Sequence, residues 1–598
     1  MLKSSIVNEN GVPALFVEGR LETAMGYTTY FEERSRYEDF ISAGYRIFFV
    51  NASFTTAPIN NFTGFSPFRK GIFEDPERSD YSEFEEAVYK ILKKCPDAVI
   101  FPRINISMPK WWTDSHPIDV VPTLKGGYRE ALFSEAFRKD GAELLKRTVR
   151  HICSSNYAHR IGGWQLCGGL TQEWFHHDNH GSLGDAAETP YKRWAKDNFG
   201  IDNAELPDSE DYVYNGNCRQ SSENAQRYAL FCNIETAKTL EIFAKAVKEE
   251  THHEQVVGAF YGYAYQSNGT PLFGTHGMRA LLNSEYLDFF SAPNAYSNGR
   301  KFGIDWADMI PVDSIKLHGK LPYIECDIRT YLTTGVGRAR PGEYPEDIYT
   351  DAVWSGPASA ELSRLALRKC FCHQLTKASA IWWFDMWGGW YDDPLLMKEL
   401  SDMKKIFDDN AEKKSKSLSS EVIFFADETA FSELLIDSPQ IKAVSQTRTN
   451  MGNIGTPYDT FMVEDAPYIL KKYKAAVFPM PFPSEAGIQS MKLCEENGIP
   501  YITASEDRLI LTSDDIRVFL IQNGIHIYTE VNDVVYIGNG YAALHSATEG
   551  KKTLTLPTVC KVTPVLGTDI PKQTTSQIEF TLKENGTALF RISTNILE

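Results

Sequence analysis

Two glutamates follow short apolar runs, and their type and placement suit catalysis by a pair of carboxyl groups. Glu173 lies in the glycine-containing segment 167–175, which follows one apolar run, and Glu325 ends the run 321–324. Two carboxyl groups about 5 Å apart can cleave a glycosidic bond with retention, because one attacks the anomeric carbon while the other protonates the leaving oxygen. Glu173 and Glu325 are therefore candidate catalytic residues if the fold brings them together.

The elements that would position them follow from the alternation of apolar runs and amphipathic stretches over the first two-thirds of the chain. Apolar residues recur at helical spacing between the runs, for example over 133–154 and 358–375. Eight strands alternating with helices predict an α/β fold, a (β/α)8 TIM barrel over 1–415, in which catalytic groups stand at the C-terminal ends of strands. The fourth and seventh strands, which carry the two glutamates, would face each other. The predicted strands are 14–17, 46–51, 98–104, 162–166, 256–261, 286–291, 321–325 and 380–384.

The last third of the chain has a different pattern. A charged, serine-containing stretch over 408–420 predicts a linker with a boundary near residue 415. Beyond it, the runs 422–426, 475–478 and 499–503 predict buried parallel strands of a small open α/β domain over 416–520. From about residue 525, short alternating strands and turn residues predict a small C-terminal β-sandwich over 521–598.

Composition limits the partners. The 598 residues carry 61 Lys and Arg against 79 Asp and Glu, so the net charge of -18 favours neither nucleic acid nor an anionic membrane. Aromatic residues make up 13% of the chain, which suits stacking on flat sugar faces. With no run of 18 apolar residues and no secretory leader, we expect no membrane association and a cytoplasmic protein, or a periplasmic or secreted one if a signal peptide has been removed.

Several segments resemble clan A glycoside hydrolases, and especially glycoside hydrolase family 42. They are Trp164-Gln165-Leu166 ahead of Glu173, Arg103 within Phe101-Pro102-Arg103-Ile104-Asn105, the pair Trp111-Trp112, Glu325, and the segments 455–465 and 473–478, which resemble that family's flavodoxin-like trimerisation domain. The resemblance implies a retaining exo-acting β-glycosidase that forms a homotrimer and needs no cofactor. It also implies that Glu173 is the acid/base, Glu325 the nucleophile, and Arg103 the residue that holds a carboxylate in the site.

The chain departs from the family pattern beside the acid/base. The family has Asn directly before that Glu, whereas this chain has Gln172 and about four extra residues after Trp164. Glutamine offers the same amide groups on a longer stem, so the contact with the sugar 2-hydroxyl changes and the identity of the sugar stays open. The cysteine cluster that binds structural zinc in some members has no counterpart here, so no metal is predicted.

Further polar and aromatic residues near predicted strand ends are candidates for substrate binding. Two structural alternatives stay open: Arg103 could form a buried ion pair, and the tryptophans could pack in the hydrophobic core. The segment 176–180, His-His-Asp-Asn-His, is interpreted as pocket rim in preference to a metal site. The predicted substrate-binding residues are Arg103, Asn105, Gln172, Trp174, Tyr263, Tyr296, Trp383 and Trp387.

The sequence thus predicts an enzyme that hydrolyses terminal β-linked hexosides, with β-galactosides preferred. A β-mannosidase or β-glucosidase of the same clan is the nearest alternative. Two alternatives of other classes stay open: a catalytically silent carbohydrate-binding or scaffold protein, and a metal-dependent hydrolase built on segment 176–180.

Overall fold

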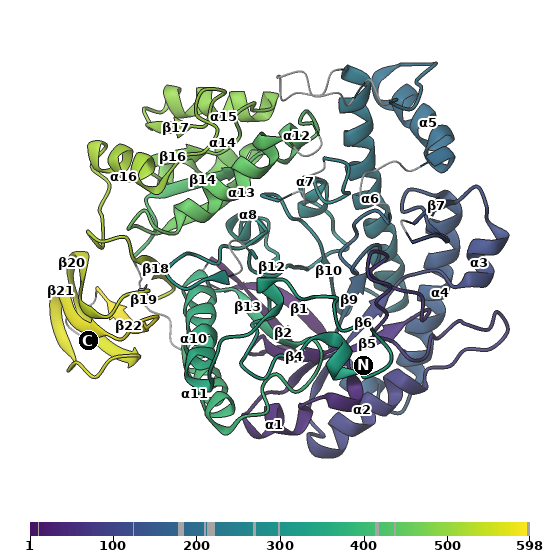
Figure 1. The fold of residues 1–598 in the computed structure, drawn as a ribbon, viewed down its shortest axis with the longest axis horizontal. Coiled ribbons are helices and arrows are strands. Elements are labelled where there is room, and N and C mark those ends of the chain that lie inside the picture. The colour runs from purple at the N-terminus through teal and green to yellow at the C-terminus, as the bar shows by residue number, and fades with distance from the viewer. Residues whose placement is uncertain are drawn as a thin grey trace.

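A closed barrel of eight parallel strands forms the centre of the computed structural model (Figure 1). The structure describes all residues except 10, 124, 178–183, 209–210, 212–221, 267–270, 297–299, 413–417, 436–437 and 595–598. Pairing of the last barrel strand with the first closes the cylinder. The barrel strands are β4 (Met25–Thr29), β5 (Ile47–Ser53), β6 (Val99–Asn105), β9 (Gly163–Cys167), β10 (Val256–Phe260), β11 (Phe289–Ser291), β12 (Leu321–Cys326) and β13 (Ala380–Asp385).

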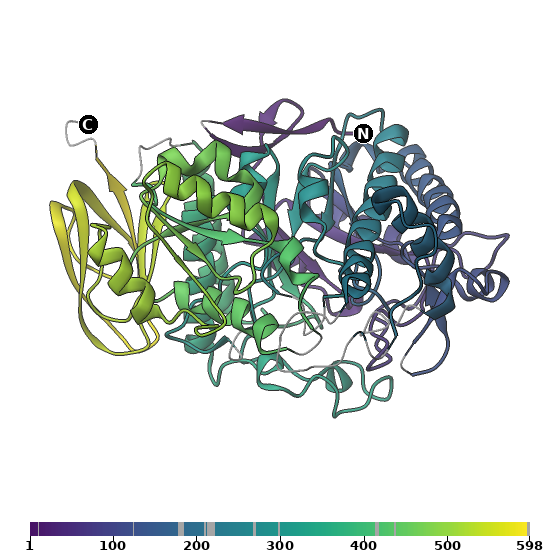
Figure 2. The same ribbon diagram turned by 90° about the horizontal axis from the view of Figure 1, so that it is seen from above.

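The prediction that residues 14–17 form the first barrel strand was wrong. These residues belong to β2 (Val12–Val17), the middle strand of a three-stranded antiparallel sheet with β1 (Ser4–Glu9) and β3 (Arg20–Leu21), which lies at the edge of the barrel (Figure 2). Buried and half-buried positions alternate along β2, so only one of its faces packs. The true first strand, β4, is buried throughout, but its sequence Met-Gly-Tyr-Thr-Thr has no apolar run that would reveal it.

Helices surround the barrel, and aromatic rings fill it. The predicted helices 133–154 and 358–375 are confirmed as α4 (Glu135–Ser154) and α10 (Ala360–Lys377). Inside the barrel, the ring of Phe49 lies 5.0 Å from that of Phe101 and 5.7 Å from that of Trp382. The interior is thus a packed core, and any site must be at a strand end. Other helices around the barrel are α2 (Ser82–Lys94), α6 (Glu223–Glu250) and α11 (Pro394–Glu412).

The second sheet is parallel and open, with the strand order β15-β14-β16-β17. It lies beside the barrel, where helices α13 (Pro439–Met451), α15 (Glu485–Glu496) and α16 (Ser513–Gln522) accompany it (Figure 1). The three predicted strands are confirmed, and a fourth lies in the segment between the first two. The strands are β14 (Val422–Ala426), β15 (Tyr458–Met462), β16 (Ala475–Phe478) and β17 (Tyr501–Thr503).

The C-terminal β domain is built from one connected antiparallel sheet with the order β18-β19-β22-β20-β21, at the end of the molecule (Figure 2). The long strand β20 pairs with both β21 and β22, and its register with β21 shifts between Thr555 and Cys560. The five strands enclose an apolar core of their own. They are β18 (Val534–Gly538), β19 (Tyr541–His545), β20 (Gly550–Leu566), β21 (Gln573–Leu582) and β22 (Thr587–Ser593).

One buried aspartate of the barrel contacts both smaller sheets. Asp305, in the loop that follows β11, accepts hydrogen bonds from the hydroxyls of Tyr458 on β15 (3.2 Å) and Tyr536 on β18 (2.7 Å). The changes from one sheet to the next lie between Glu412 and Val422 and between Gln522 and Val534. The predicted boundary near 415 falls on residues outside the described part, and the domain limits stay predictions.

Within the described residues, no helix has both the length and the apolar character required to cross a lipid bilayer.

Candidate active site

A tight, strained loop after β9 carries Glu173. Thr171, Gln172 and Trp174 all have positive φ values, of 56°, 68° and 61°. Such values are rare outside glycine, and least favourable for a β-branched residue such as threonine, so the surrounding packing must hold the loop in place. Gly169 allows the tight turn, because a Cβ atom there would lie 2.5 Å from the carbonyl oxygen of Phe175. Strain of this kind is typical of functional loops.

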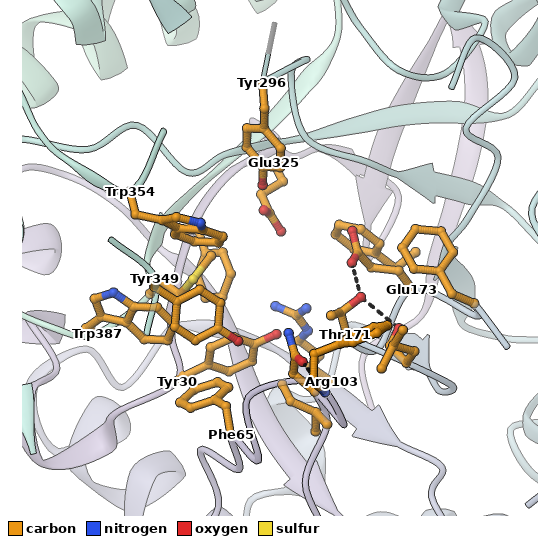
Figure 3. Close-up of a pocket in the computed structure, with 18 of the residues that line it drawn as sticks. Tyr30, Phe65, Arg103, Thr171, Glu173, Tyr296, Glu325, Tyr349, Trp354 and Trp387 are labelled. Carbon is orange, nitrogen blue, oxygen red and sulfur yellow. Dashed lines mark hydrogen bonds between the residues drawn. The ribbon is translucent and has the colours of Figure 1, made fainter. Parts of the chain in front are cut away.

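The carboxyl group of Glu173 accepts a hydrogen bond on each oxygen. The Tyr263 hydroxyl donates to Oε1. The Thr171 hydroxyl donates to Oε2 (Figure 3). Burial raises the pKa of Glu173 to about 7, while the two hydroxyl donors and the more distant Arg103 favour the ionised form. Glu173 can therefore hold or release a proton near neutral pH, as a general acid/base must.

Glu325 is the penultimate residue of strand β12 (Leu321–Cys326), and its carboxyl group faces the same cavity (Figure 3). Its side chain is 3% exposed, and among the described residues no side chain donates a hydrogen bond to it. Burial, followed by the negative charge of Asp327, raises the pKa of Glu325 well above its usual range, whereas Arg103 lowers it. The ionised form that a nucleophile needs therefore depends on the nearby positive charge of Arg103.

Arg103, on β6, lies on the floor of the cavity below the two glutamates (Figure 3). Its Nε donates to Sγ of Cys167 at 3.4 Å, and its Nη1 has no partner among the described residues. The guanidinium carbon lies 5.1–5.7 Å from the centres of four aromatic rings, those of Tyr30, Phe260, Trp382 and Phe384. This buried positive charge favours the ionised form of a carboxyl group in the site.

Aromatic side chains close the side of the cavity away from Glu173. Trp354, Tyr349, Trp387 and Phe65 form one connected cluster, with neighbouring ring centres 4.7–5.8 Å apart (Figure 3). The cavity has a volume of about 290 Å³. It is small, compared with typical ligand pockets of about 300–1,000 Å³. A pocket of this size suits one terminal sugar unit rather than a long chain.

The predicted substrate-binding residues divide into two groups. Arg103, Tyr296 and Trp387 line the cavity, and Tyr263 lines a second cavity of about 80 Å³ that Glu173 also lines. Asn105, Gln172, Trp174 and Trp383 do not line either cavity.

Each residue of the second group is buried elsewhere. Trp383 points out of the barrel and donates to the Tyr45 hydroxyl at 3.0 Å, because side chains alternate along β13 and Trp382 takes the inward position. Trp174 packs beneath its loop and donates to the carbonyl oxygen of Leu166 at 3.2 Å. Asn105 donates to Oγ of Ser53 at 3.1 Å, and the side-chain amide of Gln172 is buried with no partner among the described residues.

Sequence reasoning missed an ionic cluster next to Glu325. The buried side chain of Asp327 accepts a hydrogen bond from the Tyr296 hydroxyl at 2.7 Å and pairs with Arg300 (2.6 Å) and Arg329. Although burial opposes ionisation, the two arginines hold the pKa of Asp327 below its usual range. The alternating sequence Glu325-Cys-Asp327-Ile-Arg329 was the available signal, since alternate residues past a strand end tend to share one side.

The two described histidines of segment 176–180 are occupied by structural contacts. His176 Nε2 lies 3.1 Å from the carbonyl oxygen of Cys232, and burial lowers the pKa of its ring to about 4. His177 Nε2 lies 3.1 Å from Oε1 of Glu130, and its Nδ1 lies 3.1 Å from the amide nitrogen of Asn61. Residues 178–180 lie outside the described part. Within that part, no group of three or more His, Cys, Asp or Glu side chains is placed to hold a metal ion.

The closed barrel of eight parallel strands is a (β/α)8 fold of the kind found in clan A glycoside hydrolases, and it places one glutamate after the fourth strand and one on the seventh. No protein-family model and no curated protein matches the sequence. Solved structures do match, and what they share with the chain is the fold.

The β-galactosidase from Bacillus circulans sp. alkalophilus has a TM-score of 0.63 and 12% identity, covering 95% of this chain and 98% of its own. A catalytic mutant of a GH42 β-galactosidase from G. stearothermophilus has a TM-score of 0.60 and 9% identity, covering 99% and 100%. An apo exo-carrageenase GH42 from Bacteroides ovatus has a TM-score of 0.59 and 11% identity, covering 99% and 86%. The chain therefore has the three-part GH42-like architecture that its sequence predicted.

Proposed function

We propose that the protein is a retaining exo-β-glycosidase that hydrolyses terminal β-linked hexosides, with β-galactosides preferred and β-mannosides or β-glucosides as alternatives. The observation that carries the proposal is the shared pocket, into which Glu173 and Glu325 project from different sides above Arg103 (Figure 3). Similarity in fold to β-galactosidases supports the same class of reaction.

The mechanism follows from the surroundings of each carboxyl group. Burial raises the pKa of Glu325, and among the described residues no side chain donates a hydrogen bond to it, so the charge of Arg103 is what favours the ionised form in which Glu325 acts as the nucleophile that attacks the anomeric carbon. Glu173 retains a proton near neutral pH and gives it to the leaving oxygen as the glycosidic bond breaks. In the second step Glu173, now ionised, takes a proton from water, which displaces Glu325 from the anomeric carbon.

The closed aromatic wall supports action at chain ends. Trp354, Tyr349 and Trp387 block the cavity on the side away from the acid/base (Figure 3). Because the leaving group must lie beside Glu173, the sugar that is cleaved off has no room for a further unit behind it. This arrangement suits removal of a single terminal residue.

A homotrimer is part of the proposal and rests on the resemblance of the second sheet to a trimerisation domain. Exposed apolar side chains on adjacent helices of this domain support an assembly role: Tyr468 on α14 (Ala466–Ile469) is 72% exposed, and Ile488 on α15 is 53% exposed. Apolar surface of this kind is typical of protein–protein contacts.

The test is a panel of aryl β-glycosides, assayed for release of the phenol. Release from the β-galactoside is the expected result. Release from the β-mannoside or β-glucoside alone would transfer the assignment to that alternative. If no aryl glycoside is cleaved, the enzymatic proposal fails and a silent carbohydrate-binding or scaffold protein takes its place.

A further inference from the structure

The buried carboxylate of Glu130 joins loops that follow different barrel strands. Glu130 ends the short strand β8 (Tyr128–Glu130), which lies between β6 and β9 in the sequence. Its Oε1 lies 3.1 Å from Nε2 of His177, and the side chains of both residues are fully buried. Although burial opposes ionisation, the neighbouring charge of Arg129 lowers the pKa of Glu130 to about 2. The carboxyl group is therefore ionised and acts only as a hydrogen-bond acceptor.

The two ring nitrogens of His177 have different partners, which fixes the proton on one of them. Nε2 faces the ionised carboxylate of Glu130, so it must carry the proton and donate. Nδ1 lies 3.1 Å from the side-chain amide nitrogen of Asn61, a group that only donates, so Nδ1 must accept. The same amide nitrogen donates to the backbone carbonyl oxygen of His177 at 3.4 Å, which agrees with this orientation of the amide. A continuous chain of hydrogen bonds thus runs from Glu130 through the neutral ring of His177 to Asn61.

Asn61 belongs to segment 59–62, which lies in the loop after β5 and contributes to the pocket. The preceding residue, Pro58, is held by the same cluster, because Nη1 of Arg129 donates to its carbonyl oxygen at 2.5 Å. Arg129 in turn pairs with Glu130 through Nε and Nη2, each at 3.3 Å. The segment is therefore tied to Glu130 at two points. Its three members that line the cavity are Ile59, Asn60 and Phe62.

Segment 59–62 also contacts the loop that carries the acid/base. The backbone N–H of Thr171 donates to the carbonyl oxygen of Ile59 at 2.6 Å, and the Thr171 hydroxyl donates to Oε2 of Glu173 (Figure 3). Thr171 has a φ of 56°, which is unfavourable for a β-branched residue, so its neighbours must hold it in this conformation. A shift of segment 59–62 would therefore move Thr171 and, with it, the carboxyl group of Glu173.

We propose that His177 is a positioning residue for Glu173, which it holds in the geometry for proton transfer through Asn61 and segment 59–62. This inference rests on the proposed glycosidase function and gives a role to a histidine that lines neither cavity. Removing the ring would take one buried partner from Glu130 and one from Asn61. Because buried polar groups without partners are costly, segment 59–62 would shift to find new ones.

The experiment compares two aryl β-glycosides of one sugar, the sugar that the native enzyme cleaves best. The dinitrophenyl glycoside has an acidic leaving group that needs no proton, whereas the methoxyphenyl glycoside depends on proton transfer from Glu173. In His177→Leu, we expect kcat/KM for the methoxyphenyl glycoside to fall by about 10- to 100-fold relative to kcat/KM for the dinitrophenyl glycoside. A loss of folded protein would reduce both values equally and leave their ratio unchanged.

Two further variants test the hydrogen-bond chain itself. His177→Gln supplies an amide that can donate to Glu130 and accept from Asn61, so it should restore the ratio to within about threefold of the native value. Asn61→Leu breaks the other end of the chain and should change the ratio as His177→Leu does. The double variant, Asn61→Leu with His177→Leu, should be no worse than either single variant, because both interrupt one path. If His177→Leu does not fold, Asn61→Leu carries the same test.

The matched control is a buried histidine of the C-terminal domain. His545, on β19, lies with Nδ1 2.9 Å from Oγ1 of Thr587, and its Nε2 accepts from the backbone N–H of Gly303 at 3.0 Å. His545→Leu loses a similar set of buried hydrogen bonds and should keep the native ratio. A native ratio in His177→Leu and Asn61→Leu, or the same change in His545→Leu, would overturn the inference. Failure of the native enzyme to cleave either substrate would overturn the glycosidase function itself.

Discussion

The Tyr263 hydroxyl donates a hydrogen bond to Oε1 of Glu173, opposite the Thr171 hydroxyl on Oε2. Both donors favour the ionised carboxylate, whereas burial favours the neutral acid, and the outcome is a pKa of about 7 for Glu173. The two hydroxyls thus set the upper end of the pH range in which Glu173 can act as an acid.

Replacing Tyr263 should shift the pH profile upward. Tyr263→Phe removes a donor that favours the ionised form, so the pKa of Glu173 rises and its proton is retained to higher pH. The basic limb of kcat/KM, near pH 7 in the native enzyme, should shift up by about one unit. Thr171→Val is the matched variant and should shift the limb in the same direction. If kcat/KM of Tyr263→Phe falls but its basic limb stays at the native pH, Tyr263 contributes to packing and not to the pKa of Glu173.

Asp327→Asn should shift the acidic limb of the pH profile of kcat/KM. Glu325 must be ionised to attack, and the charge of Asp327 raises the pKa of Glu325. Removing that charge lowers this pKa, so the acidic limb of kcat/KM should shift to lower pH. Arg300 and Arg329 lose their partner, and we expect the free energy of unfolding to fall by about 3–5 kcal/mol.

The control for Asp327→Asn is Tyr296→Phe. It removes the 2.7 Å hydrogen bond to Asp327 but leaves every charge in place. The acidic limb should therefore stay close to its native position. If Tyr296→Phe shifts the limb as far as Asp327→Asn does, the charge of Asp327 is not the cause.

Several features of the fold could be predicted because their sequence patterns are local. Seven of the eight barrel strands overlap predicted strands, because each is mostly apolar, as expected for strands buried on both sides. The first strand could not be recognised, since Gly26, Thr28 and Thr29 are buried by tertiary contacts: the Thr28 hydroxyl, for example, donates to the carbonyl oxygen of Phe49 at 2.8 Å. No local pattern announces such a contact.

The candidate site was predictable only in part, for a similar reason. Glu173 and Glu325 were found because they lie at or near strand ends, and Arg103 was found because its segment resembles that of glycoside hydrolase family 42. Trp354 and Tyr349 lie in the long connection between β12 and α10, whose short helices have no periodic pattern, so nothing in the sequence indicated that they close the pocket. The tryptophan-rich run of β13 gave the opposite error, since side-chain alternation turns Trp383 outward.

Metal independence is a further prediction. Prolonged treatment with a chelator should leave the rate of aryl glycoside hydrolysis unchanged, since His176 and His177 already pair with Cys232 and Glu130. The measurement is activity before and after chelation, with and without added zinc. Loss of activity that zinc restores would move segment 176–180 from a structural role to the catalytic centre.

The assembly prediction concerns mass in solution. Light scattering at micromolar concentration should give three times the chain mass of 67.6 kDa. With a net charge of -18, protomers repel one another unless a specific interface holds them together. A monomeric mass at both low and moderate salt would contradict the trimer and leave the exposed side chains of α14 and α15 unexplained.

The two glutamates should differ in kinetic signature, because they act in different steps. Glu325→Gln removes the attacking atom, so hydrolysis should fall by roughly 10⁴-fold or more for every substrate, whatever its leaving group. Glu173→Ala removes the acid and the later base. A substrate with an acidic phenol needs no protonation to leave, so this variant should still release one equivalent of phenol in a burst and then stall at the glycosyl–enzyme intermediate.

Azide distinguishes the two roles by the configuration of the product. It is a small anion that needs no general base, so it should restore turnover of Glu173→Ala by displacing Glu325 from the anomeric carbon. Two successive inversions then give a β-glycosyl azide, which NMR of the isolated product identifies. If Glu173 were instead the nucleophile, azide would attack the substrate directly in the Glu173→Ala variant, and a single inversion would give the α-azide. An α-configured product, or near-normal hydrolysis by Glu325→Gln, would therefore reverse or remove the assignment of these two residues.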